Sequence, residues 1–133
     1  MANLQAGRDT RAKEIFISVD YPVKAATHIY DGALVGLVGG YAAPAVDGAG
    51  NYVVGVADFE IDNTAGANGD LHIRVRRGVF HLDTANIVQA DCGKPCYPTD
   101  DHTVSHTAGA NNTLAGEILS LDVEGGVWVK VGP

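Results

Sequence analysis

Glycine, asparagine, aspartate and proline interrupt this 133-residue chain about every ten residues, and no stretch shows the period of an amphipathic helix. Between the interruptions lie short runs rich in valine, isoleucine and tyrosine, which favour strands. Tight reversals are expected at 39–40, 47–51, 62–70 and 124–126. This organisation predicts an all-β protein, a small compact β-barrel or sandwich of short antiparallel strands.

The chain divides into an arm and a domain. Residues 1–13 are polar and aperiodic, which predicts a flexible N-terminal arm. Residues 14–133 are expected to form a single β domain that is long enough to bury a core. One helical turn is expected within 87–98, where prolines and glycine permit only short elements. Strands are expected at 14–19, 33–38, 41–44, 52–61, 71–82, 103–105, 113–123 and 127–131.

Residues 71–82 carry the clearest strand pattern. Leu71, Ile73 and Val75 alternate with polar residues and therefore share one face. The Arg-Arg-Gly sequence at 76–78 then shifts the phase of the alternation, which predicts a β-bulge.

Four residues of the domain are candidates for a protein interface. Arg74, Arg76 and Arg77 form a basic stripe in an acidic protein, and the planar arginine fork suits a partner's carboxylates. The alternative is that the arginines are solvated or pair with this chain's own acids. Trp128 is a candidate anchor, although the alternation around it does not decide which face of the sheet it occupies.

The charge excludes two classes of partner. The formal net charge is −7, and phosphate binding requires basic residues clustered over a whole face, so neither nucleic acid nor a membrane is an expected partner. No run of about 18 apolar residues is present, and residues 1–11 lack the apolar core of a signal peptide. Synthesis in a cytoplasm is therefore expected.

The cysteines and histidines raise the question of zinc. Cys92 and Cys96 are too few for a disulfide scaffold and would stay reduced in a cytoplasm, although one bridge is open to a chain outside cells. With His102 and His106 they offer four zinc-type donors. If 102–106 is a strand, however, its two imidazoles lie about 13 Å apart, too far for one ion. We expect no metal and no cofactor.

The sequence also lacks a clear catalytic pattern. No serine has the context of a nucleophile elbow, and the glycines at 36–40 lack the rest of a phosphate-binding motif. Asp58, Glu60 and Asp62 alternate and would suit a cation or an acid–base pair, but an exposed solvated edge explains them more simply. The protein is not expected to be an enzyme.

Six short segments follow one another in an informative order and spacing: YDGALVGL at 30–37, VGVA at 54–57, DNTAGA at 62–67, IRVRRGVF at 73–80, ADCGK at 90–94 and GVWV at 126–129. In this order they resemble the small capsid decoration, or cement, proteins of tailed bacteriophages. The resemblance covers residues 25–131.

The resemblance implies a structural role without catalysis. Proteins of that family dock onto the outer surface of the expanded phage head and clamp neighbouring copies of the major capsid protein. It also implies binding at local threefold positions, often as a homotrimer, with an N-terminal arm that becomes ordered on the shell. For this chain it implies a location on the virion surface after synthesis in the host cytoplasm, with Arg8 and Arg11 as further candidate contacts.

The competing function is a glycan-binding or surface-binding β module of a phage fibre or adhesin. Tyr30, Tyr41 and Tyr97 would stack on sugars if they were exposed together. They are spread along the sequence, so core or interface roles are favoured.

Overall fold

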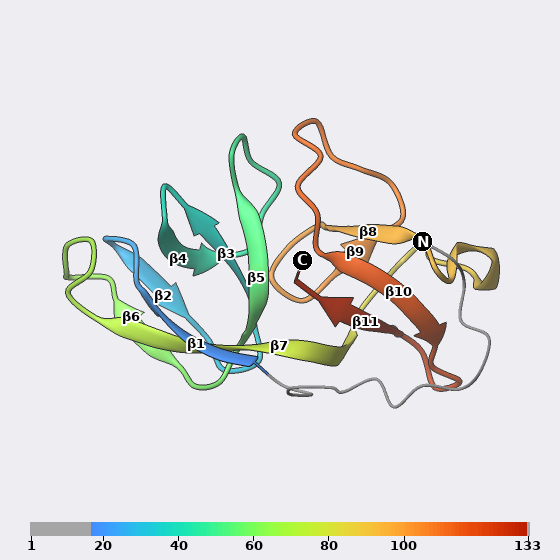
Figure 1. The fold of residues 1–133 in the computed structure, drawn as a ribbon, viewed down its shortest axis with the longest axis horizontal. Coiled ribbons are helices and arrows are strands. Elements are labelled where there is room, and N and C mark those ends of the chain that lie inside the picture. Colours follow the sequence, from blue (N-terminus) through green and yellow to red (C-terminus); the bar gives the residue numbers. More distant parts are fainter. Residues whose placement is uncertain (1–16, 133) are drawn as a thin grey trace, which may run out of the picture.

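The computed structural model describes residues 17–132 and confirms the all-β class. A sheet of nine strands curls into an antiparallel half-barrel, and two further strands form a small ladder (Figure 1). The one helical element described is the 3₁₀ turn η1 (Gln89–Asp91), within the segment where a helical turn was expected. The strands are β1 (Ile17–Pro22), β2 (Thr27–Ile29), β3 (Leu34–Val38), β4 (Tyr41–Pro44), β5 (Tyr52–Ala57), β6 (Ile61–Asn63), β7 (His72–Leu82), β8 (Pro95–Pro98), β9 (Val104–Ser105), β10 (Gly116–Leu121) and β11 (Val127–Val131).

β7 is the central strand of the molecule. It pairs antiparallel with β1 over its first half, with β5 at Val75 and Arg76, and with β11 over its second half (Figure 1). β3 and β4 extend the sheet beyond β5, while β10, β8 and β9 extend it beyond β11. β7 therefore joins the two halves of the domain.

Each half has its own core, and β3 and β5 lie between the two. Leu34 of β3 points into one core and Val35 into the other, as do Val53 and Val54 of β5. Strands buried on both faces explain why these segments are continuously apolar. The N-terminal core contains Val23, Ile29, Ala33, Val35, Ala42, Val54, Ala57, Ile73 and Val75. The C-terminal core contains Leu34, Ala45, Val53, Val56, Leu82, Ile87, Cys96, Val104, Ala115, Ile118, Val127, Val129 and Val131.

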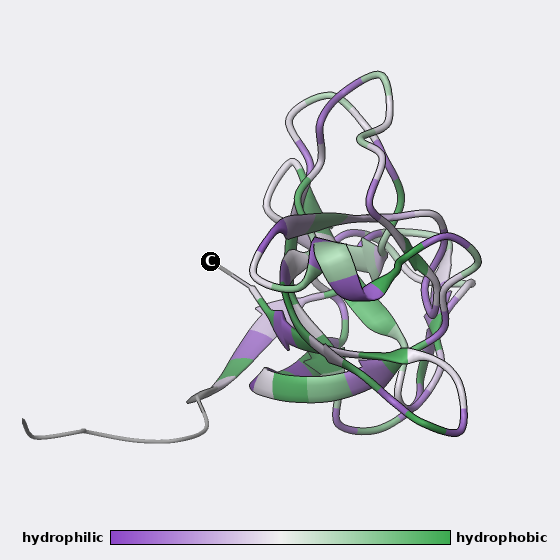
Figure 2. Cartoon of the chain, turned by 90° about the vertical axis from the view of Figure 1, so that its right-hand side faces the viewer, coloured by the Kyte–Doolittle hydropathy of each residue, from purple (hydrophilic) through white to green (hydrophobic). Residues whose placement is uncertain are grey.

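The prediction of a β-bulge at 76–78 is wrong. The pairings of β7 with β1, β5 and β11 show no register shift. Instead, Ile73 and Val75 face the N-terminal core, whereas Leu82, on the opposite face of the strand, lies in the C-terminal core. The phase of the pattern changes because β7 passes from one core to the other. Alternating hydrophilic and hydrophobic bands along the strands are visible in Figure 2.

Other strand boundaries differ from the expectation. The expected strand 52–61 divides, because β5 ends at Ala57 and β6 pairs with β2. The expected strand 113–123 begins only at Gly116. A side chain at Gly116 would collide with the Lys130 backbone carbonyl of β11, so this position requires glycine. The expected arm 1–13 and the start of the strand expected at 14–19 lie outside the described residues.

Candidate interaction surface

Two of the three stripe arginines pair with acids of the same chain. On one face of β7, Arg74 Nε lies 3.5 Å from Asp20 Oδ1 of β1. Arg76 Nε lies 3.0 Å from Asp58 Oδ1, just beyond β5, without the alignment of a hydrogen bond. The Arg76 guanidinium carbon also lies 5.7 Å from the centre of the Phe80 ring. Such exposed pairs contribute little to stability, about 0–1 kcal/mol each.

Arg77 points the other way. Strand alternation places it on the face of Ile73 and Val75, opposite Arg74 and Arg76. Its side chain is half-buried, and its Nε donates a hydrogen bond of 3.2 Å to the Val54 carbonyl of β5. No acidic side chain of residues 17–132 lies within 4.0 Å of this guanidinium. Among the described residues, its remaining N–H groups thus have no carboxylate acceptor.

Arg77 lines an apolar groove of about 260 Å³, which we call the Arg77 groove. Tyr52 and Leu114 on its walls are 68% and 46% exposed. A second hollow of about 310 Å³, lined by Pro95, Glu117 and Lys130 among others, shares Leu114 and Gly132 with it, so the two hollows are adjacent. The walls of the Arg77 groove are Tyr21, Leu37, Tyr52, Val53, Val54, Arg77, Leu114 and Gly132.

Trp128 does not line the Arg77 groove. It is 38% exposed on the outer face of β11, opposite His81 of β7, and the two rings meet edge to face with centroids 5.5 Å apart. Val79, which is 46% exposed, shares this face. Alternation along β7 puts Arg77 on this same face, so Trp128 and Arg77 lie on one side of the sheet although Trp128 is not part of the groove. Arg8 and Arg11 lie outside the described residues.

Two of the three alternating acids, Glu60 and Asp62, lie beside a histidine that the sequence did not single out. His28 Nε2 lies 3.0 Å from Glu60, and His28 Nδ1 lies 3.9 Å from Asp62. Asp58 instead pairs with Arg76. His28 is far from these acids along the chain, so no local sequence pattern predicted the cluster. Only the pairing of β2 with β6 brings these residues together.

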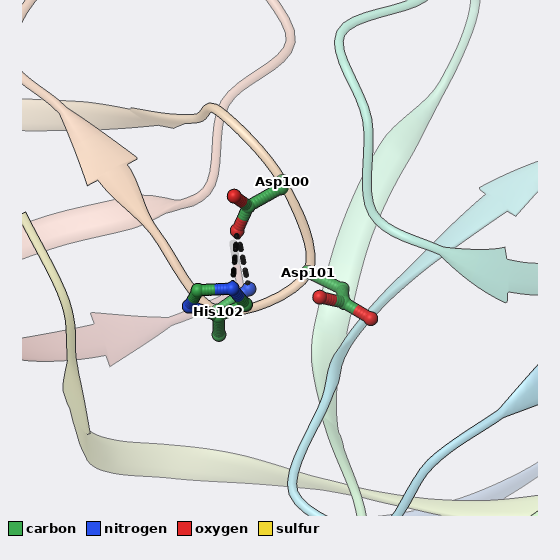
Figure 3. A group of neighbouring side chains, drawn as sticks. All are labelled: Asp100, Asp101 and His102. Carbon is green, nitrogen blue, oxygen red and sulfur yellow. Dashed lines mark hydrogen bonds and ion pairs between the residues drawn. The ribbon is translucent and has the colours of Figure 1, made fainter.

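The four zinc-type residues do not converge. Among residues 17–132, the group whose ligand atoms approach one another is Asp100, Asp101 and His102, without either cysteine. Asp100 faces His102 in this group (Figure 3). His102 Nδ1 also lies 3.0 Å from Asp83, and His102 Nε2 lies 3.5 Å from Asp100. These contacts fasten the loop after β8 to the end of β7, and we call Asp83, Asp100, Asp101 and His102 the acidic corner.

The acidic corner predicts a pH response. The hydrogen bond to Asp83, followed by the charge of Asp100, raises the pKa of His102 above its usual 6.5. A raised pKa means that the contact stabilises the fold below pH 6.5 and is lost as the pH rises through the folded-state pKa. In an NMR titration the His102 ring signal should move at a midpoint above 6.5, and Asp83→Asn should lower that midpoint. Asp70→Asn, in the loop before β7, is the control, and an equal effect of both variants would contradict the assignment.

The two thiols predict a difference in reactivity. Both cysteines are free, and burial raises the pKa of the Cys96 thiol to about 12. Because the thiolate is the reactive form, Cys96 should resist modification near neutral pH, whereas half-buried Cys92 remains accessible. A chromogenic disulfide reagent should titrate one thiol per native chain and two in denaturant. Two rapid equivalents from the native protein would contradict this assignment.

Comparisons with known proteins identify no relative of this chain. Within residues 17–132, no helix has the length and apolar character needed to cross a membrane. Searches of protein-family models, curated proteins and solved structures find no match to this chain.

Proposed function

We propose that this protein is a structural decoration protein that binds the outer surface of an expanded phage head. In this role it stabilises contacts between major capsid protein subunits and carries out no chemical reaction. The observation that carries the proposal is the Arg77 groove, an apolar hollow with a half-buried arginine that has no acidic partner among residues 17–132. The resemblance of residues 25–131 to phage cement proteins supports the same role.

The Arg77 groove suits a protein segment that presents an apolar side chain next to a carboxylate. Tyr52 and Leu114 offer apolar contact area, and the arginine fork can donate two hydrogen bonds to a carboxylate. Arginine and tyrosine in partly desolvated hollows are the residue types that dominate binding energy at protein interfaces. We assign such a segment of the major capsid protein as the occupant.

The β body suits a clamp. Its backbone is already ordered in the sheet, so docking costs less conformational entropy than it would for a module that folds on binding. A homotrimer remains part of the proposal, with the Trp128 face as the surface between copies. Solution mass at several concentrations tests this part. A monomer mass at every concentration would mean that a trimer forms only on the capsid shell.

The proposal is tested with purified, undecorated heads. Expanded heads should bind the protein to saturation at a fixed number of copies per capsid protein, and should rupture at a higher temperature once decorated. Unexpanded heads are the matched control, because they lack the mature arrangement of subunits. Absence of attachment to expanded heads, or equal attachment to both forms, would contradict the proposal.

The glycan-binding alternative gains little from the side chains named for it. Tyr30 is 57% exposed and stacks on His28 with ring centroids 4.2 Å apart, whereas Tyr41 and Tyr97 are half-buried. A sugar platform requires exposed rings on one surface. A glycan array separates the two functions, and specific sugar binding would favour the alternative.

A further inference from the structure

The Arg77 groove and the second hollow beside it gather basic residues on an acidic protein. The chain has 16 acidic residues but only nine lysines and arginines, six of them within residues 17–132. Arg77 lines the Arg77 groove, Lys130 lines the second hollow, and Lys94 lies between two residues that line the second hollow. Half of the described lysines and arginines thus belong to this one surface.

Arg77 and Lys130 lie on one face of the sheet. Lys130 of β11 is directly opposite Val79 of β7, and directly opposed residues share a face. Arg77 precedes Val79 by two positions, so alternation puts Arg77 on that face as the diagonal neighbour of Lys130. Backbone positions related in this way are about 7–8 Å apart. The surface therefore presents two cations at close spacing.

Neither cation is neutralised by an ion pair with another described residue. Within residues 17–132, the lysines and arginines that form ion pairs are Arg74 and Arg76. Glu117 of β10 is directly opposite Lys130, but their charged groups do not come within 4.0 Å of each other. Among the described residues that line the two hollows, Glu117 is also the one acid. The lining residues therefore carry more positive than negative charge.

Hydrogen bonds from a distant loop hold Leu114, the apolar wall that the two hollows share. Asp47 accepts hydrogen bonds of 3.1 Å from Asn111 N–H and 3.2 Å from Thr113 N–H. Thr113, which precedes Leu114, is buried, and its hydroxyl accepts a hydrogen bond from Gly48 N–H and donates one to the Gly48 carbonyl, both of 3.1 Å. The shared wall is thus fixed before a partner binds, which lowers the entropy cost of docking.

The second hollow favours an occupant with an extended backbone. Three of the residues that line it are glycines, namely Gly93, Gly116 and Gly132. Because these positions carry no side chain, another backbone can approach them closely. In an extended segment, side chains two residues apart point to one side and are separated by about 6.6 Å. This separation is close to the spacing of Arg77 and Lys130.

We propose that the Arg77 groove and the second hollow together bind one acidic, extended segment of the major capsid protein, with carboxylates two residues apart beside Arg77 and Lys130. The inference rests on the proposed function and adds to it a second contact and a chemical class for the occupant. The guanidinium takes one carboxylate through two hydrogen bonds, and the ammonium takes the other as a point charge.

The net charge favours a capsid segment over a second copy as the occupant. Each copy has a formal net charge of −7, so two copies repel each other over most of their surfaces. An acidic segment of a different protein meets the basic surface without that general repulsion.

Co-sedimentation with expanded heads at low ionic strength tests the proposal through two variants with opposite expected effects. Lys130→Gln removes a cation from the surface and should weaken attachment by about three- to fivefold. Glu117→Gln removes the acid that lines the second hollow and should strengthen attachment by a similar factor. If these residues acted only through the pairing of β10 with β11, both variants would weaken attachment.

Lys24→Gln is the control for net charge. It removes the same charge as Lys130→Gln, but Lys24 lines neither hollow, so attachment should stay unchanged. Unfolding in urea checks that each variant is folded.

The wild type separates failure of this inference from failure of the proposed function. If the wild type does not attach to expanded heads, the proposed function is wrong and this inference falls with it. If the wild type attaches but Lys130→Gln and Glu117→Gln have no effect or effects of the same sign, the occupant is not an acidic segment and the inference alone is overturned. Reversed signs would identify a basic segment. Variants that change the solution mass of the free protein would identify a second copy as the occupant, which would also overturn the inference.

Discussion

Ile118→Ala should lower the free energy of unfolding by about 2–5 kcal/mol, because it leaves a cavity in the C-terminal core. Ile118 is fully buried there, and its backbone also bonds to Gly93 and Lys94 on the segment before β8. Since domains of this size are stable by only about 5–15 kcal/mol, the variant would lose a large share of that stability. Urea unfolding followed by circular dichroism measures the difference.

The adjacent residue gives the control for this variant. Leu119 is 41% exposed, so Leu119→Ala should cost about 1 kcal/mol or less. Equal losses for the two variants would mean that β10 does not direct Ile118 into a core. A much smaller loss for Ile118→Ala would contradict the packing described for the C-terminal half.

Arg77→Gln should weaken attachment to expanded heads by about thirtyfold, the effect of losing about 2 kcal/mol at a central interface residue. Glutamine retains an N–H donor for the Val54 carbonyl but removes the positive charge that a capsid carboxylate would meet. Binding is measured by co-sedimentation with heads across a range of protein concentrations. Unfolding in urea checks that the variant remains folded.

Arg74→Gln is the control for Arg77→Gln, since it lies on the same strand but faces outward and pairs with Asp20. Its effect on attachment should stay within about threefold, as expected for an exposed ion pair. If Arg74→Gln weakened attachment as much as Arg77→Gln, the contact would lie on the outer face of β7. The Arg77 groove would then not be the docking surface.

Much of the fold could be predicted because its signals are local. Alternation within 71–82 identified β7, and glycine-rich turns marked the ends of β3, β4, β10 and β11. The change of phase at 76–78 was visible too, but its cause was not. A bulge and a change of core leave the same pattern in one strand, and only the partner strands distinguish them.

The interaction surface was harder to predict because its parts come from distant segments. The three arginines were grouped by their closeness in sequence, although alternation alone already places Arg77 on the face opposite Arg76. The Arg77 groove takes walls from Tyr21 to Gly132, so no local pattern contains it. The Thr-Ala-Gly-Ala-Asn sequence occurs at 64–68 and again at 107–111, yet its two copies are held differently. The adjacent Asn63 side chain donates to the Ala67 carbonyl in the first copy, whereas Asp47, 64 residues away, accepts a hydrogen bond from Asn111 N–H in the second.

Amide hydrogen exchange of the protein bound to expanded heads, compared with the free protein, tests the central claim most directly. Attachment through the Arg77 groove should slow exchange in the 52–54 and 114–116 segments, where Tyr52 and Leu114 are exposed in the free protein. Slowing confined to the Trp128 face, or no slowing at saturating occupancy, would contradict the account.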